Sequence, residues 1–170
     1  MIDIKTDYIF KTITSINKGW SSDKKYYVEA ETGERLLLRT VDRSEYESKK
    51  SEFEAMKRLA ETGIPMSKPL KFGMSDDGKS VYTLFTWCEG EDAAEMLPKL
   101  TDTEQYELGL KSARYLREIH CIPAPVDQEK WETKFNRKAD SKIKQYYDCP
   151  VKIKGGDRII EYIESNRHLL

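Results

Sequence analysis

Paired cysteines, histidines and long apolar runs are scarce in this sequence. Its 170 residues include two histidines and three widely spaced cysteines, without a Cys-x-x-Cys pair. This argues against a disulfide framework and a thiolate zinc site, and favours a reducing compartment. No run approaches the roughly 18 apolar residues of a membrane-spanning helix. The polar residues 1–7 hold no stretch typical of a signal peptide, so we expect a cytoplasmic protein without a membrane partner.

An excess of charge of one sign is also missing. Lysine and arginine number 29 against 30 acidic residues, so the whole chain offers no broad electrostatic attraction for nucleic acid. Residues 130–154 do interleave basic and aromatic side chains, a pattern that can bind single strands. We interpret those aromatics as core residues of a helical subdomain with lysines covering the outside, and predict no nucleic-acid partner.

What the sequence does contain is a strand-rich first half. Short β-prone runs predict five strands, at residues 8–13, 25–31, 35–40, 69–74 and 80–86. A polar loop over residues 14–24 follows the first strand, and Gly-containing turns connect the second strand to the third and the fourth to the fifth.

Helices are expected in three places. The capping-box spacing of Ser44 and Glu47 predicts a helix that ends near Gly63, so this helix separates the third and fourth strands. A second such spacing begins at Thr101 and predicts a helix to His120, broken afterwards by two prolines. One more helix is expected over residues 157–166.

Arg39 and Glu52 are the most informative charged residues. Arg39 follows three leucines in a strand that should be largely buried, where an unpaired guanidinium would be very costly. Glu52 lies at the edge of the apolar stripe of the first helix, whereas Glu54 and Lys57 should point outward. Each side chain alone could simply reach water. Together they can satisfy each other, and in protein kinases such a strand cation and helix acid hold the phosphates of ATP.

Two connecting segments could complete a nucleotide site. The loop over residues 16–24 offers the hydroxyls of Ser21 and Ser22 to phosphate, although a Ser- and Asp-rich hairpin tip needs no function. After the fifth strand, Trp87 and Cys88 lie in an extended linker whose backbone could read a base edge. Packing between lobes is the simpler explanation for these two side chains.

The order and spacing of these segments resemble the aminoglycoside phosphotransferase family, whose fold is related to the eukaryotic protein kinases. The resemblance covers essentially the whole chain and rests on Gly19–Val28, Leu36–Arg39, Glu52–Pro65, Phe85–Gly90 and Leu116–His120. It implies an α+β fold with a kinase-like N-lobe, a five-stranded antiparallel sheet plus one helix. The N-lobe would span residues 1–86, a hinge linker residues 87–92, and part of a helical C-lobe residues 93–170.

The resemblance also implies roles at the phosphate end of the nucleotide. Ser21 and Ser22 would lie in the nucleotide-positioning loop above the phosphates. Arg39 would contact oxygens of the α- and β-phosphates, and Glu52 would hold it in place. Protein kinases usually have lysine where this chain has Arg39, but a guanidinium keeps the charge and can bind phosphate through two N–H groups.

At the purine end, the resemblance assigns four further residues. Leu37 would help to form the roof over the base, and Phe85 would occupy the gatekeeper position. The carbonyl of Thr86 and the N–H of Cys88 would hydrogen-bond the purine of ATP or GTP.

The chemistry of that family requires groups that this sequence lacks. A His-Gly-Asp-x-x-x-x-Asn loop positions the acceptor hydroxyl and helps to bind Mg²⁺, and a later Asp-Phe segment supplies the other metal ligand. Here His120 is followed by Cys-Ile, and no Asp-Phe dipeptide occurs. We therefore expect no catalytic or metal-binding residue within this chain, and Mg²⁺ ligands beyond residue 170.

The resulting hypothesis is an ATP- or GTP-dependent kinase that phosphorylates a hydroxyl of a small molecule. Acidic residues between Glu89 and Glu95 would suit a cationic acceptor such as an aminoglycoside, although acids also favour helix starts. Choline, homoserine, fructosamine, methylthioribose and macrolide kinases share the lobe design. The alternative is a truncated, catalytically inactive nucleotide-binding module or scaffold fragment.

Overall fold

The structure is a computed structural model that describes residue 4 and residues 6–169. Residues 1–3 and 5, in the predicted N-lobe, and residue 170, at the end of the predicted C-lobe, lie outside the described residues. The chain forms two compact units, residues 1–122 and residues 123–170.

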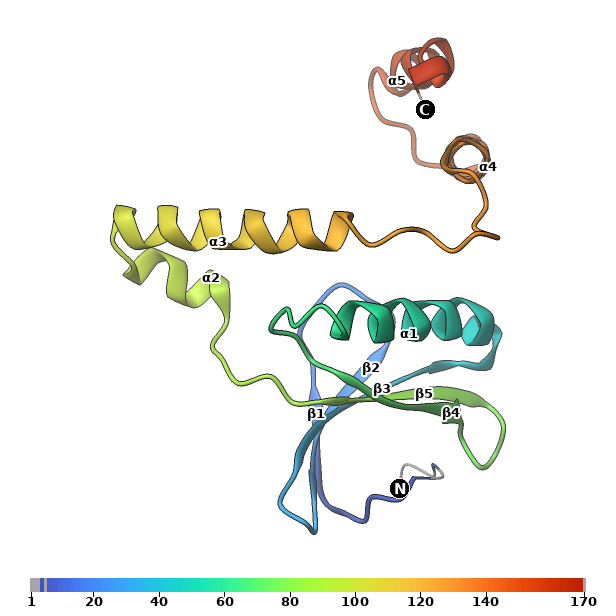
Figure 1. The fold of residues 1–170 in the computed structure, drawn as a ribbon. Coiled ribbons are helices and arrows are strands. Elements are labelled where there is room, and N and C mark those ends of the chain that lie inside the picture. Colours follow the sequence, from blue (N-terminus) through green and yellow to red (C-terminus); the bar gives the residue numbers. More distant parts are fainter. Residues whose placement is uncertain (1–3, 5, 170) are drawn as a thin grey trace. The chain divides into compact units, whose positions relative to one another are not determined.

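The first unit contains a five-stranded sheet, as Figure 1 shows. Its strands are β1 (Phe10–Ile16), β2 (Lys24–Ala30), β3 (Arg35–Asp42), β4 (Pro69–Met74) and β5 (Ser80–Thr86). The strand order is β1-β2-β3-β5-β4 and every neighbouring pair is antiparallel. The predicted α+β class and antiparallel sheet are confirmed.

The first strand differs from its prediction. It begins at Phe10 rather than residue 8 and continues to Ile16, so the loop to β2 starts at residue 17. Pairing explains the difference, because Ser15 and Ile16 are opposite Tyr26 and Lys25 of β2. A partner strand can keep polar residues in extended conformation even where hydrophobic alternation has ended.

Helix α1 (Tyr46–Ala60) lies along one face of the sheet (Figure 1). The predicted capping box is wrong, because the 3₁₀ turn Arg43–Glu45 precedes the helix and Asp42 caps that turn instead. Its carboxylate accepts hydrogen bonds from the N–H of Ser44 at 2.9 Å and from the Ser44 hydroxyl at 2.7 Å. The expected end is confirmed, since Gly63 adopts a φ of 80° that favours glycine.

The two faces of the sheet are covered differently. On the face away from α1, the fully buried core consists of Val28, Leu36, Leu38, Tyr82 and Leu84. On the α1 face, Phe53 of the helix packs against Phe72 of β4 with ring centroids 5.6 Å apart. Because alternate residues of a strand point to opposite faces, Leu37 and Arg39 lie on the α1 face.

The remaining helices follow β5. They are α2 (Ala93–Met96), α3 (Asp102–His120), α4 (Trp131–Asp148) and α5 (Gly156–Ser165), with 3₁₀ turns at Leu97–Lys99 and Arg167–Leu169. Both halves of the predicted capping box are present at Thr101, and α3 ends where the prolines predicted a break. None of the helices in the described part of the chain combines the length and apolarity needed to cross a membrane.

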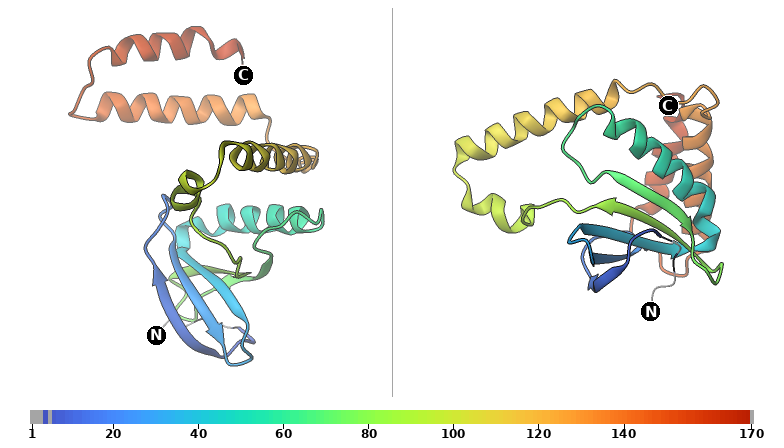
Figure 2. Two further views of the ribbon diagram at one scale, coloured as in Figure 1. Left: turned by 90° about the vertical axis from the view of Figure 1, so that its left-hand side faces the viewer. Right: turned by 60° about the horizontal axis from the view of Figure 1, so that its bottom comes forward.

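Helix α4 was not assigned from the sequence, and its aromatic residues are not the core that we expected. Trp131 and Phe135 stack with ring centroids 5.3 Å apart, yet 65% of Trp131 remains exposed. Within the second unit (Figure 2), Arg167 contacts Asn136 at 2.8 Å and Asp140 at 2.6 Å. The rings of Trp131 and Tyr147 remain mostly exposed.

Candidate functional site

Arg39 is held in the middle of the sheet, on the face that α1 covers. It is directly opposite Lys25 of β2 and Thr83 of β5, in the central strand of the sheet. Its Nη1 donates to Oε1 of Glu52 at 2.9 Å. The predicted meeting of the strand cation and the helix acid is therefore confirmed.

Two residues that were not selected from the sequence complete this arrangement. Asp23, at the end of the β1–β2 loop, accepts a hydrogen bond from Nη2 of Arg39. Lys49 of α1 donates to Asp23 at 3.0 Å and to Glu52 at 2.9 Å. Each cation thus contacts both carboxylates. We call these four residues, Asp23, Arg39, Lys49 and Glu52, the charge ring.

The charge ring is partly buried, so water screens its charges less than it screens an ion pair on the surface. The side chain of Asp23 is 3% exposed and that of Lys49 15% exposed, whereas Glu52 keeps 40% of its side-chain surface. Burial raises the pKa of Asp23, but the hydrogen bond from Lys49 and the charge of Arg39 outweigh this, so its pKa is lowered. Burial likewise lowers the pKa of Lys49, and the two carboxylates outweigh it and raise that pKa. Both groups stay charged at neutral pH.

A sequence signal for Lys49 existed. Lys49 and Glu52 are three residues apart on α1, a spacing that places both on one side of a helix. Asp23 gave no comparable signal, because it stands in a polar hairpin loop where aspartate is common. Only the close approach of the loop to β3 buries it.

The β1–β2 loop, residues 17–23, forms a flap next to the charge ring. A hollow of about 540 Å³ lies at this flap, and Lys18, Gly19, Ser21 and Lys25 are among its lining residues. Ser22 does not line it and instead borders a smaller hollow with Lys24 and Thr40. The structure therefore brings only Ser21 of the two predicted serines to the larger hollow.

Lysines fix the conformation of this flap. Nζ of Lys25 donates to the carbonyl of Lys18 at 3.0 Å. A Cβ on Gly19 would come within 2.9 Å of that Nζ, and its φ of 98° also favours glycine. Lys18 in turn pairs with Asp92 at 3.2 Å and Glu95 at 3.1 Å, so part of the acidic segment after β5 is neutralised.

Of the four predicted purine-binding residues, Leu37 and Phe85 lie on the same face of the sheet as Arg39. Thr86 is opposite Leu36 at the end of β5, and Cys88 follows in the linker. Leu37 is directly opposite Phe85, which is 3% exposed. The ring of Tyr27 meets Trp87 edge-on, with ring centroids 4.9 Å apart. Cys88 is exposed, and among the described residues its N–H donates no backbone hydrogen bond. The linker after β5 therefore lies beside Tyr27, at the end of the sheet face that carries Leu37.

The described residues include no large cluster of possible metal ligands. No group of three or more His, Cys, Asp or Glu side chains gathers at a metal-binding distance within the part of the chain that the structure describes. The carboxylates of the charge ring already contact two cations. No step through a metal is therefore derived from these residues.

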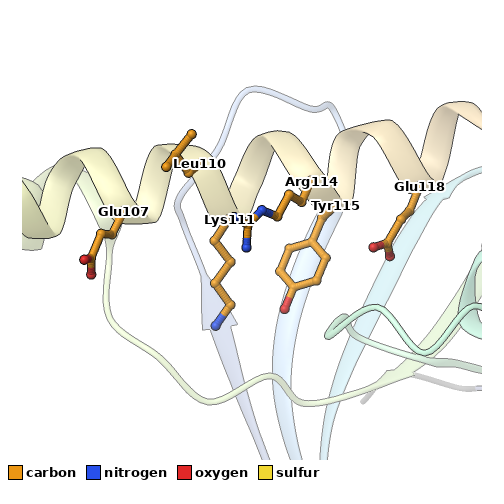
Figure 3. Close-up of a pocket in the computed structure, with 6 residues that line it drawn as sticks. All are labelled: Glu107, Leu110, Lys111, Arg114, Tyr115 and Glu118. Atoms are coloured by element: carbon orange, nitrogen blue, oxygen red, sulfur yellow. The ribbon is translucent and has the colours of Figure 1, made fainter.

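Another hollow, of about 580 Å³, lies along one helix away from the predicted residues. It is lined by Glu107, Leu110, Lys111, Arg114, Tyr115 and Glu118, all from α3 (Figure 3). Lys111 and Tyr115 extend from the same side of the helix in this view (Figure 3). A single helix cannot enclose a ligand, and the two basic groups of this hollow lie between two acidic ones. This hollow therefore does not compete with the charge ring as a candidate site.

An antiparallel sheet whose central strand carries a cation paired to a helix acid defines the class of kinase-like phosphotransferases. Residues 12–170 match the family model described as the phosphotransferase enzyme family, APH, and the chain belongs to this family. Comparison with curated proteins finds no match.

Proposed function

We propose that this chain supplies the nucleotide-binding part of an ATP- or GTP-dependent kinase that transfers phosphate to a hydroxyl of a small molecule. The observation that carries the proposal is the 2.9 Å pairing of Arg39 with Glu52 on the α1 face of the sheet. In kinases this pairing sets a cation against the α- and β-phosphates. Arg39 keeps 22% of its side chain exposed, which leaves an edge for a ligand.

The purine would lie at the other end of the same face. The partly exposed Leu37 offers apolar surface beside the buried Phe85, and the exposed linker at Cys88 offers a backbone N–H. Thr86 and Cys88 would hydrogen-bond the base, and Ser21 and Ser22 would lie over the phosphates. Residues 87–92 would serve as the hinge between an N-lobe, residues 1–86, and helical residues 93–170.

Phosphate transfer needs groups that the charge ring does not supply. A nucleotide-bound Mg²⁺ would neutralise charge that develops on the phosphates, and a carboxylate would position the acceptor hydroxyl. We assign neither role to a residue of this chain. Glu91 of the segment after β5 would favour a cationic acceptor such as an aminoglycoside, whereas Glu89 is already paired with Arg35 at 2.6 Å.

Arg39→Ala tests this proposal. We expect ATP binding to weaken about 10- to 100-fold, because a charged contact with phosphate is lost, whereas adenosine binding changes little. Trp87 adjoins the proposed purine site, so its fluorescence reports both titrations. Arg58→Ala removes an exposed arginine of α1 and serves as the control that should change neither affinity.

Two outcomes would contradict the proposal in different ways. Equal losses of ATP and adenosine affinity in Arg39→Ala would remove Arg39 from the phosphate role. No fluorescence response of the unaltered chain to adenosine, ATP or GTP, with or without Mg²⁺, would favour the alternative of a scaffold that binds no nucleotide.

A further inference from the structure

The charge ring contains an anion and a cation that the pairing of Arg39 with Glu52 does not need. Asp23 comes from the flap, and Lys49 comes from the helix one turn before Glu52. The ring therefore connects three separate elements, the flap, β3 and α1. Its two positive and two negative charges sum to zero, so the ring as a whole does not attract a polyphosphate.

We propose that Asp23 occupies the place of a nucleotide phosphate, and that a polyphosphate displaces it and binds both Arg39 and Lys49. This inference rests on the proposed function and deepens it by adding Lys49 as a second phosphate-binding cation. It also assigns a regulatory role to the flap, because Asp23 holds the flap to Arg39 and Lys49 when no nucleotide is bound.

The hydrogen bonding of Arg39 favours this exchange. Nε of Arg39 is buried and has no hydrogen-bond partner among the described residues. Nε and Nη2 share one edge of the planar guanidinium, and Asp23 accepts only from Nη2. A phosphate can accept from both N–H groups of such an edge at once. Replacing Asp23 by phosphate would therefore satisfy a donor that the present arrangement leaves unused.

Lys49 is suited to the same ligand. Its ammonium has three N–H donors, and the hydrogen bonds to Asp23 and Glu52 use two of them. When Asp23 leaves, Glu52 still contacts both cations and keeps them in place. One carboxylate between two cations leaves a net positive charge beside the flap. A polyphosphate of several negative charges would be attracted to it.

The experiment compares Asp23→Asn and Lys49→Gln with the unaltered chain, using ATP, inorganic tripolyphosphate and adenosine in buffer with EDTA. We expect Lys49→Gln to weaken ATP and tripolyphosphate binding about tenfold, because it removes a positive charge close to the phosphates. Asp23→Asn should strengthen the binding of both ligands about tenfold, because it removes a negative charge from the same place. Adenosine affinity should not change. Lys57→Gln, which alters an exposed lysine of the same helix paired with Glu54 at 3.2 Å, is the matched control.

The results that would contradict this inference differ from the result that would contradict the proposed function. Weaker or unchanged ATP binding in Asp23→Asn would show that Asp23 is only a structural tether. Equal behaviour of Lys49→Gln and Lys57→Gln would remove Lys49 from the site. If the unaltered chain bound neither adenosine nor ATP, the proposed function itself would fail and take this inference with it.

A second measurement needs no substitution and decides the matter if Asp23→Asn does not fold. Carbon-13 NMR of the Asp23 carboxyl would follow its titration with and without tripolyphosphate. Displacement removes Asp23 from its two cations, so we expect its lowered pKa to rise toward the ordinary aspartate value when the ligand is present. A pKa that stays low in the presence of saturating tripolyphosphate would overturn the exchange.

Discussion

Asp23 loses nearly all its contact with water when the chain folds, and two cations compensate for that loss. A carboxylate with a lowered folded-state pKa adds stability above its ordinary value of about 4, and that stability is lost as pH falls through the folded-state value. Lys49 behaves in the opposite sense. Its raised pKa adds stability below its ordinary value, and that stability is lost as pH rises through the folded-state value.

Asp23→Asn should therefore reshape the pH dependence of stability. Near pH 7 we expect the free energy of unfolding to fall by about 2 kcal/mol, the value of a hydrogen-bonded charge in partly buried surroundings. The difference should shrink below about pH 4, where the carboxylate of the unfolded chain becomes protonated, and vanish once pH falls through the lowered folded-state pKa. Urea denaturation followed by circular dichroism between pH 3 and pH 8 measures it. A constant difference across this range would contradict an ionic role for Asp23.

Residue-level reasoning predicted one half of the charge ring. Arg39 and Glu52 were found because a cation in an apolar strand and an acid beside an apolar helix stripe each need a partner. Asp23 could not be found in this way, since nothing in a polar loop shows that its carboxylate will be buried. The roles of the predicted residues in nucleotide binding stay predictions.

At the scale of elements, local signals succeeded where side chains act on their own backbone. The β4–β5 hairpin has the predicted bounds because an apolar alternation flanks a turn with Asp77 and Gly78. The prediction was wrong for the start of β1 and of α1, because pairing with β2 sets the bounds of β1 and Asp42, rather than Ser44, acts as the cap. Helix α4 does carry aromatic residues at helical spacing, such as Trp131 and Phe135, but no capping residue marks its start at Lys130, so its bounds were not predicted.

The start of α3 gives a prediction at this scale. The Thr101 hydroxyl accepts from the N–H of Glu104 at 3.3 Å, and the Glu104 carboxylate accepts from the N–H of Thr101 at 2.8 Å. Thr101→Ala should destabilise the helix start by about 1 kcal/mol. Hydrogen exchange of the amides in the first turn measures this effect.

Ser112→Ala is the matched control for the cap. Its hydroxyl donates to the carbonyl of Leu108 at 2.8 Å in the middle of α3, and alanine is the better helix former. Exchange in the first turn should be unchanged in this variant. Equal acceleration in both variants would mean that the hydroxyl of Thr101 is not a local cap.

At the scale of the whole molecule, the first unit holds all the residues proposed to bind nucleotide. Its sheet joins the flap, β3 and the linker after β5, and α1 adds Lys49 and Glu52. A two-state exchange at Asp23 would link nucleotide binding to the position of the flap. The same carboxylate holds the flap and occupies the place that a phosphate would take. The second unit contributes none of these contacts among the described residues.

The connection between the two units should therefore be open to proteases. Residues 121–130 form no helix or strand, and Lys130 is exposed at the end of this stretch. We expect limited trypsin digestion to cut first after Lys130, because exposed irregular backbone fits a protease more readily than strands or helices. Mass spectrometry would then find fragments 1–130 and 131–170. ATP should leave this cut unchanged, because no residue proposed to bind nucleotide lies in this stretch, whereas an early cut within β3 would contradict the division into these units.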